Sequence, residues 1–318
     1  MNHKNTFIPR TLIVEAPAKI NLHLEILGLR EDGYHELAMV MQSINLTDTI
    51  KISSNQIGRI TLASDDLSLS DGDDNLIIKA AKLIQKYSCN DNLGADITLQ
   101  KNIPIGAGLA GGSSDAAATL LGLNSLWGLG YSYQKLELIS SEIGSDIPFC
   151  ISGGRQLCFG RGEILEALKF SPSSLSLLLV KDPKLSISTP WAYSQSKYKN
   201  HMNYLRTESQ FEEKRNLLRN SDWLNSLKAP MVLPLKNDLQ KVVVTESPQV
   251  QNAIDLLKSM RGNISVAMSG SGPSCYALFP NLDLAKSALE DNRFKFQNLG
   301  LDTWCCTLLD HGVNIVSK

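Results

Sequence analysis

The stretch Pro104–Ala117 reads PIGAGLAGGSSDAA and is the most informative part of the sequence. Four glycines, at positions 106, 108, 111 and 112, remove side chains, so backbone N–H groups can approach a ligand closely. The serines and aspartate that follow open a segment rich in alanine and leucine, which predicts a helix over Ser113–Trp127. A helix N-terminus offers unpaired N–H donors and roughly half a positive charge. The stretch therefore predicts a phosphate-binding loop, since four glycines exceed what an ordinary Ser/Asp helix cap requires.

Three known kinds of phosphate loop can be compared with this stretch. Gly106–Gly111 satisfies GxGxxG, but a dinucleotide-binding loop follows a hydrophobic strand and precedes an acidic residue about 20 positions on. Here residues 99–104 (LQKNIP) are polar with a proline, and the next acid after Asp115 is Glu137, so the match is accidental. A Walker A loop would need Gly-Lys-Ser/Thr after the glycines, and a protein kinase would need His-Arg-Asp and Asp-Phe-Gly. The sequence contains neither Gly-Lys-Ser/Thr after the glycines, nor His-Arg-Asp, nor Asp-Phe-Gly.

Length and composition limit the classes of protein. The 318 residues predict one large or two medium domains, and 31 Lys+Arg against 32 Asp+Glu leave a net charge of -1. Such a balance argues against a protein that coats nucleic acid. The sequence contains no apolar run of about 18 residues, and the polar start lacks a signal-peptide core, which predicts a cytoplasmic protein with no membrane partner. Six cysteines without a CxxC pair predict free thiols, and five histidines without ligand spacing predict no zinc site.

Apolar periodicity predicts strands and helices along both halves of the chain. The expected strands are Thr11–Leu27 (broken at Pro17–Lys19), Leu37–Ile44, Thr49–Ile52, Asp96–Gln100, Leu175–Val180, Ser265–Ser269, Ser274–Phe279 and Thr303–Leu309. The expected helices are Asn75–Tyr87, Ser113–Trp127, Gln134–Ile143, Pro248–Met260 and Leu282–Asp291. The polar stretch Ser196–Leu227, with charges of both signs, predicts exposed helices with loops. This order of elements favours an α+β protein of two domains over a doubly wound sheet.

Three motifs in order along the chain resemble the GHMP kinases, which phosphorylate small molecules. The glycine loop is similar to their second motif at Pro104, Gly108, Leu109, Ser113, Ser114 and Ala116, although Ala110 stands where some members have glycine. Ala16–Leu22 (APAKINL) resembles the first motif, and Met268–Pro273 (MSGSGP) resembles the third. The resemblance implies the two-domain GHMP kinase fold. Residues 1–168 would form a ribosomal-protein-S5-domain-2-like ATP domain, and residues 169–318 a ferredoxin-like α/β-plait domain that completes the substrate site.

Further segments indicate one branch of the family. Arg30–His35 (REDGYH), Gly144–Phe149 (GSDIPF) and Pro183–Tyr193 (PKLSISTPWAY) resemble members that act on a cytidine diphosphate-linked polyol. The resemblance implies transfer of the γ-phosphoryl group of ATP to the 2-hydroxyl of 4-diphosphocytidyl-2-C-methyl-D-erythritol, in the non-mevalonate route to isoprenoids. A homoserine-type or mevalonate-type kinase and a non-catalytic ligand-binding relative are the alternatives.

The resemblance also assigns roles to residues. Asp146 would be the general base, and Lys19 would stabilise the developing charge. Without the resemblance, the ordinary interpretation is favoured for both residues: Asp146 is a carboxylate at a helix start, and Lys19 is a lysine at a strand end. Binding of the cofactor ATP would fall to Pro104, Ile105, Gly106, Ala107, Gly108, Leu109, Ala110, Gly111, Gly112, Ser113 and Ser114. The substrate would contact Asn21, Tyr34, His35, Thr189, Tyr193, Ser269, Gly270, Ser271 and Gly272.

The ligands themselves carry further expectations. Mg²⁺ would be held by the ATP phosphates and by waters near Ser113 and Ser114, and the protein would have no metal site of its own. Tyr34 and Tyr193 would stack on the cytosine ring, and His35 would hydrogen-bond the cytosine or its phosphates. Asn75 and Lys101 are candidates for adenine contacts.

Overall fold

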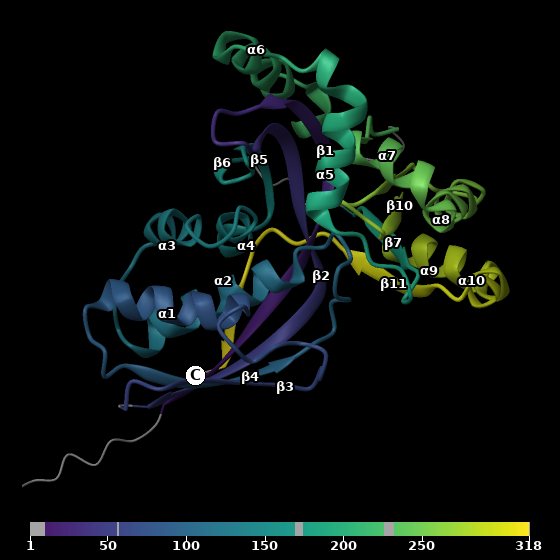
Figure 1. The fold of residues 1–318 in the computed structure, drawn as a ribbon. Coiled ribbons are helices and arrows are strands. Elements are labelled where there is room, and N and C mark those ends of the chain that lie inside the picture. The colour runs from purple at the N-terminus through teal and green to yellow at the C-terminus, as the bar shows by residue number, and fades with distance from the viewer. Residues whose placement is uncertain (1–9, 56, 169–173, 226–231, 318) are drawn as a thin grey trace, which may run out of the picture.

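The computed structural model describes residues 10–317 apart from residues 56, 169–173 and 226–231. It holds two sheets joined side by side, each covered by helices (Figure 1). The larger sheet has the order β12-β1-β2-β4-β3, with β5 and β8 pairing to β2 and β1 and β6 pairing to β5. Its strands are β1 (Thr11–Leu29), β2 (His35–Asn55), β3 (Ile60–Ser64), β4 (Gly94–Gln100), β5 (Arg155–Gly160), β6 (Ile164–Ala167), β8 (Lys236–Asn237) and β12 (Asn314–Ser317).

The hairpin of β1 and β2 runs through the whole molecule and corrects two predictions. We expected β1 to break at Pro17–Lys19, but it is continuous over 19 residues. The expected strands Leu37–Ile44 and Thr49–Ile52 are parts of one strand of 21 residues. Pro17 pairs with Thr47, whereas Ala18 pairs with Ile44, so two extra residues of β2 bulge at this point. A bulge lets the ladder pass the proline, which has no N–H to donate.

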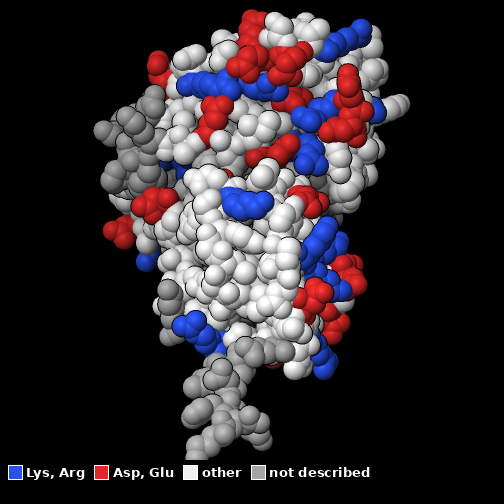
Figure 2. All heavy atoms as spheres, turned by 90° about the vertical axis from the view of Figure 1, so that its left-hand side faces the viewer, with Lys and Arg blue, Asp and Glu red and all other residues white. Residues whose placement is uncertain are grey.

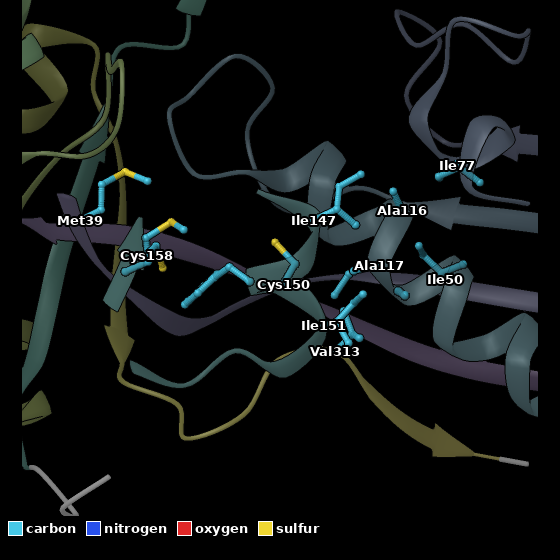
Figure 3. Packing of buried hydrophobic residues seen from close by; sticks show 14 of the residues in the cluster. Met39, Ile50, Ile77, Ala116, Ala117, Ile147, Cys150, Ile151, Cys158 and Val313 are labelled. Carbon is cyan, nitrogen blue, oxygen red and sulfur yellow. The ribbon is translucent and has the colours of Figure 1, made fainter. Parts of the chain in front are cut away.

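Helices α1 (Leu76–Ser88), α2 (Gly111–Leu126), α3 (Tyr133–Ser140) and α4 (Ile147–Ser152) cover one face of this sheet (Figure 1). Small residues let α2 lie close to the strands, since a Cβ at Gly122 would come within 2.5 Å of Ile52. Figure 3 shows Ala117 of α2 beside Ile151 of α4 and Val313. This dry packing fixes the positions at which α2 and α4 begin, and both N-termini belong to the site described below.

The second sheet has the order β11-β7-β10-β9. Its strands are β7 (Ser176–Lys181), β9 (Ser265–Met268), β10 (Cys275–Phe279) and β11 (Asp302–Thr307), and all neighbours are antiparallel. The helices of this half are α5 (Thr189–Asn200), η1 (His201–Asn203), α6 (Glu208–Arg219), η2 (Asp222–Asn225), α7 (Asp238–Glu246), α8 (Pro248–Lys258), α9 (Leu282–Asp291) and α10 (Arg293–Leu299). Numbered from the first of these four strands, the order is 4-1-3-2, with helices between the first and second and between the third and fourth. This is the expected ferredoxin-like plait.

The two halves are tied together by the chain itself. β8 and β12 both come from the C-terminal half, yet they pair with β1 of the larger sheet. The hydroxyl of Tyr276 in β10 donates a hydrogen bond of 2.8 Å to the carbonyl of Asn21. The predicted division between residues 168 and 169 lies at the edge of a segment outside the described residues, so it stays a prediction.

The polar stretch after β7 is only partly exposed. α6 buries Phe211, Arg215 and Leu218, which the charge pattern did not predict; residues 226–227 of this stretch lie outside the described residues. Figure 2 shows charges of both signs interleaved at the top of the molecule, where α6 lies, above a broad uncharged area. In the part of the chain that the structure describes, none of the helices is long and apolar enough to cross a membrane. The six cysteines are free, four of them buried.

Candidate active site

A cavity of about 930 Å³ is lined by residues of both halves. It brings together most of the residues singled out in the sequence, which come from six separate segments of the chain. These are residues 104–113 of the glycine loop together with Lys19, Asn21, Tyr34, His35, Asp146, Thr189, Tyr193, Gly270 and Ser271. Three expected residues, Ser114, Ser269 and Gly272, are buried in the wall behind it.

The glycine loop ends on the N-terminus of α2, which begins at Gly111 and thus two residues before the predicted start. Ala110 is the N-cap residue and has a left-handed backbone with φ of 56°, a conformation that usually calls for glycine. Its methyl group cannot accept a hydrogen bond, so the amides of the first turn are left to face the cavity. The loop is fastened to β1, because the carbonyl of Leu109 accepts a bond of 3.0 Å from the amide of Lys19.

The buried residues of the second and third motifs hold this loop in place. Ser269 donates to the carbonyl of Gly108 at 3.0 Å, and Ser114 donates to the carbonyl of Pro17 at 2.7 Å. Gly108 has a φ of +73°, and a Cβ there would lie 2.3 Å from the carbonyl oxygen of Ser269. The two glycine-rich segments therefore touch backbone to backbone, which explains why both avoid side chains.

Lys19 and Asp146 meet beside the loop. Lys19 is in the middle of β1, and its side chain is only 6% exposed. Its ammonium group donates to Asn21 Oδ1 at 2.7 Å and lies 3.7 Å from Asp146 Oδ2. Asp146 is the N-cap residue of α4, where the sequence allowed an ordinary capping carboxylate, but the side chain turns toward Lys19 and is 34% exposed. A fixed cation beside an accessible carboxylate is an arrangement that can accept a proton and stabilise an alkoxide.

Aromatic residues line another part of the cavity. Tyr193 of α5 stacks on His35 with ring centroids 5.1 Å apart, and Tyr204 meets the same ring edge-on at 5.6 Å. His35 Nε2 is buried and lacks a hydrogen-bond partner among the described residues. Burial lowers the pKa of His35, and the positive charge of Lys197 lowers it further. A neutral imidazole with a free nitrogen suits recognition of an uncharged heterocycle.

The two candidates for adenine contacts are both engaged in the protein. Asn75 caps α1 by accepting from the amide of Ile77 at 2.8 Å, and its amide group donates to Ser70. Lys101 bridges Asp48 at 2.5 Å and Asp115 at 2.9 Å. Burial opposes the charge on Lys101, but the two carboxylates outweigh it and raise its pKa. Both residues also line the cavity. Their contact with adenine stays a prediction.

Two cations in the cavity wall were missed in the sequence. Arg161 follows β5, and its guanidinium lies 5.0 Å from the ring centroid of Tyr34. Lys197 extends from α5. The available signal was the spacing of Lys197, four residues after Tyr193 and so on the same side of a helix. Among residues 10–317, outside the gaps given above, no group of three or more His, Cys, Asp or Glu side chains is arranged to hold a metal ion.

Comparison with known proteins assigns the chain to the family that its motifs resemble. Residues 75–154 match the N-terminal domain of GHMP kinases, and residues 212–298 match the C-terminal domain. A 4-diphosphocytidyl-2-C-methyl-D-erythritol kinase of Prochlorococcus marinus is 56% identical over 315 residues, which is 99% of each chain.

The chain belongs to the GHMP kinases.

Solved structures of this family share the architecture. A 4-(cytidine 5'-diphospho)-2C-methyl-D-erythritol kinase superposes with a TM-score of 0.67 and 29% identity, over 95% of this chain and 99% of the other. The homoserine kinase of Cytophaga hutchinsonii has a TM-score of 0.72 at 17% identity, over 99% and 100% of the two chains. The second likeness shows the fold alone. The predicted two-domain GHMP kinase fold is confirmed.

Proposed function

We propose that this GHMP kinase transfers the γ-phosphoryl group of ATP to the 2-hydroxyl of 4-diphosphocytidyl-2-C-methyl-D-erythritol, a step of the non-mevalonate route to isoprenoids. The observation that carries the proposal is the meeting of Lys19 and Asp146 beside the glycine loop, in one cavity with the aromatic residues around His35. The relative of 56% identity bears the name of this activity.

Asp146 accepts the proton of the attacking hydroxyl as the new P–O bond forms and the bond to the ADP oxygen breaks. Lys19 stabilises the negative charge that develops on the attacking oxygen. Asn21 fixes the direction of the ammonium group through its 2.7 Å hydrogen bond. The products are the 2-phosphate and ADP, so atoms and charge balance with one proton left on Asp146.

The phosphates of ATP bind to the amides of residues 106–112 and to the N-terminus of α2. Mg²⁺ suits this site, because the phosphates supply most of the oxygen ligands that the ion prefers and the hydroxyl of Ser113 in the cavity wall is a further oxygen donor. Ser113, which lines the cavity, would contact the ion through water. The bound ion would neutralise phosphate charge.

The cytosine ring stacks on Tyr34 or Tyr193, and the free nitrogen of His35 hydrogen-bonds its edge. Arg161 and Lys197 supply positive charge for the diphosphate of the substrate. This small-molecule role needs no nucleic-acid partner, and the free thiols suit a reducing cytoplasm.

The proposal is tested by incubating the purified protein with ATP, Mg²⁺ and each of four acceptors in parallel: the cytidine-bearing substrate, methylerythritol lacking the cytidine group, L-homoserine and mevalonate. We expect ADP formation with the first alone. Phosphorylation of homoserine or mevalonate, or of methylerythritol lacking the cytidine group at an equal rate, would contradict the assignment.

A further inference from the structure

The carboxylate of Glu36 lies at the centre of an ion-pair chain outside the cavity. Glu36 follows His35 in β2, so its side chain points to the opposite face of the strand. It is 2% exposed. Its Oε1 accepts from the amide of Gly160 at 3.1 Å, and its Oε2 accepts from Arg30 at 2.9 Å. A carboxylate buried this deeply needs such partners, since an unpaired charge there would be strongly unfavourable.

The remaining partner comes from α6, in the polar stretch for which the sequence suggested no role. Arg215 donates to Glu36 Oε1 at 2.5 Å, and its side chain is 11% exposed. Glu208 and Glu212 on the same helix accept from Arg215 at 2.5 and 3.2 Å and fix its direction. An interaction with three carboxylates makes Arg215 a rigid link between α6 and β2.

At its other end, the series of ion pairs reaches the loop of residues 30–34 between β1 and β2. Arg30 joins Glu36 to Asp32, whose Oδ1 lies 3.2 Å from Arg30 Nε. The same arginine closes the loop through its backbone, because its amide donates to the carbonyl of Tyr34 at 2.8 Å. Gly33 donates back to the carbonyl of Arg30 at 3.1 Å. The conformation that presents Tyr34 and His35 to the cavity therefore depends on Arg30, and Arg30 on Glu36.

α6 is also seated directly on the end of β1. A Cβ at Gly28 would lie 2.8 Å from the ring of Phe211 and 2.5 Å from the carbonyl of Leu205. The amide of Leu205 donates to the carbonyl of Leu27 at 2.8 Å. Backbone contact this close leaves α6 little freedom to shift, so Arg215 is held where Glu36 needs it.

We infer that Arg215 is a positioning residue for the cytidine end of the substrate: through Glu36 and Arg30 it fixes the loop that presents Tyr34 and His35. This inference rests on the proposed function for the identity of the ligand, whereas the effect on the loop itself does not. The segment from α5 to α6 then holds His35 from both faces of β2, with Tyr193 and Tyr204 on one side and Arg215 on the other.

The test compares Arg215→Met with Arg219→Met in the full chain. Arg219 lies one turn further along α6, and its side chain is 27% exposed. It also pairs with two carboxylates, Glu166 and the Glu212 that it shares with Arg215, but it makes no contact with Glu36. For Arg215→Met we expect the KM of the cytidine substrate to rise roughly tenfold while kcat and the KM of ATP change less than about twofold. Arg219→Met should leave all three constants close to those of the wild type.

A second readout does not depend on the substrate. Amide hydrogen exchange of residues 30–36 should become about tenfold faster in Arg215→Met and stay unchanged in Arg219→Met. Arg215→Lys, which keeps the charge, should restore part of the protection.

If Arg215→Met does not fold, the double variant Arg215→Met/Glu36→Leu removes both charges and avoids an orphan carboxylate. It should fold and show the same rise in the KM of the cytidine substrate.

Unchanged KM and unchanged exchange in the folded Arg215 variants would overturn the inference, as would an equal effect of Arg219→Met. A wild-type protein inactive on the cytidine substrate would instead refute the proposed function, and hydrogen exchange alone would then decide the positioning role.

Discussion

The ammonium nitrogen of Lys19 lies 3.7 Å from Oδ2 of Asp146, one ångström further than it lies from Oδ1 of Asn21. Lys19 is therefore hydrogen-bonded to a neutral amide and only near the carboxylate. Because Asp146 keeps a third of its side chain exposed, one of its oxygens can accept a proton from a hydroxyl that approaches through the cavity. The ammonium group of Lys19 stays close enough to contact the oxygen atom of that hydroxyl.

Replacing Lys19 by methionine should therefore impair the chemical step. We expect Lys19→Met to lower kcat by about a hundredfold or more, because a buried cation next to the reacting oxygen is lost. The KM of ATP should change little, since the proposed phosphate ligands are the loop amides and not Lys19. Steady-state kinetics with each substrate varied in turn measures both effects. Lys82→Met, which removes an exposed lysine paired with Asp73, is the control and should behave as wild type. A Lys19 variant with normal kcat and a raised KM for ATP would make Lys19 a phosphate ligand instead.

The contact between the glycine loop and the third motif gives a second prediction. Gly108 and Gly128 both have left-handed backbones, with φ of +73° and +65°. A Cβ on Gly108 would lie 2.3 Å from the carbonyl oxygen of Ser269, whereas a Cβ on Gly128 would meet no described heavy atom within 4 Å. Both alanine variants should lose about 1–2 kcal/mol of stability from the backbone alone.

Only Gly108→Ala should also weaken ATP binding, by roughly tenfold or more, because the loop must move away from Ser269. Calorimetric titration with a non-hydrolysable ATP analogue, next to thermal unfolding of both variants, separates the two effects. Equal ATP affinity of the two variants would mean that the close approach has no part in shaping the loop.

Much of the fold followed from local sequence. Leu282–Asp291 was predicted with the bounds that the structure gives α9, and the apolar run before residue 181 is the buried strand β7. The long β1–β2 hairpin was predicted in pieces, because Pro17 breaks the hydrogen-bonding pattern of a strand unless a partner bulges opposite it. That compensation comes from Asn45 and Leu46, far along the chain, so local periodicity cannot reveal it.

The site was predictable where motifs carried it and not where packing did. Lys19, Asp146 and the loop residues stand in ordered motifs, and the structure brings them together. Arg161 was missed because only the fold brings its guanidinium onto the ring of Tyr34, which is more than a hundred residues away in the sequence. Ala110 stands where some family members have glycine, and its positive φ shows a strained position at the start of α2 that the sequence alone did not reveal.

The charge next to His35 gives a prediction about pH. Burial and Lys197 both lower the pKa of His35, so Lys197→Met should raise this pKa toward its ordinary value of about 6.5. Lys199→Met is the matched control, because Lys199 is on the same helix but pairs with Glu246 at 3.4 Å. NMR titration of the His35 ring measures the shift directly. A pKa unchanged by Lys197→Met would mean that this lysine does not act on the ring.

The same depressed pKa affects stability in a defined window. Between the pKa of folded His35 and about 6.5, the unfolded chain binds more protons than the native protein, so this group destabilises the fold as pH falls. Above about pH 6.5 the contribution vanishes. The variant Lys197→Met should narrow the window, which denaturant unfolding at several pH values would detect.

The most direct test of the catalytic account is Asp146→Asn, which keeps the shape of the side chain and removes its ability to accept the proton. The measurement is a single-turnover assay of ATP-dependent phosphorylation of the cytidine substrate, with ATP affinity determined on the same preparation. The account predicts that phosphoryl transfer slows by about a thousandfold or more while ATP affinity stays within about threefold. Transfer at a rate close to that of the wild type would contradict the assignment of Asp146 as the general base.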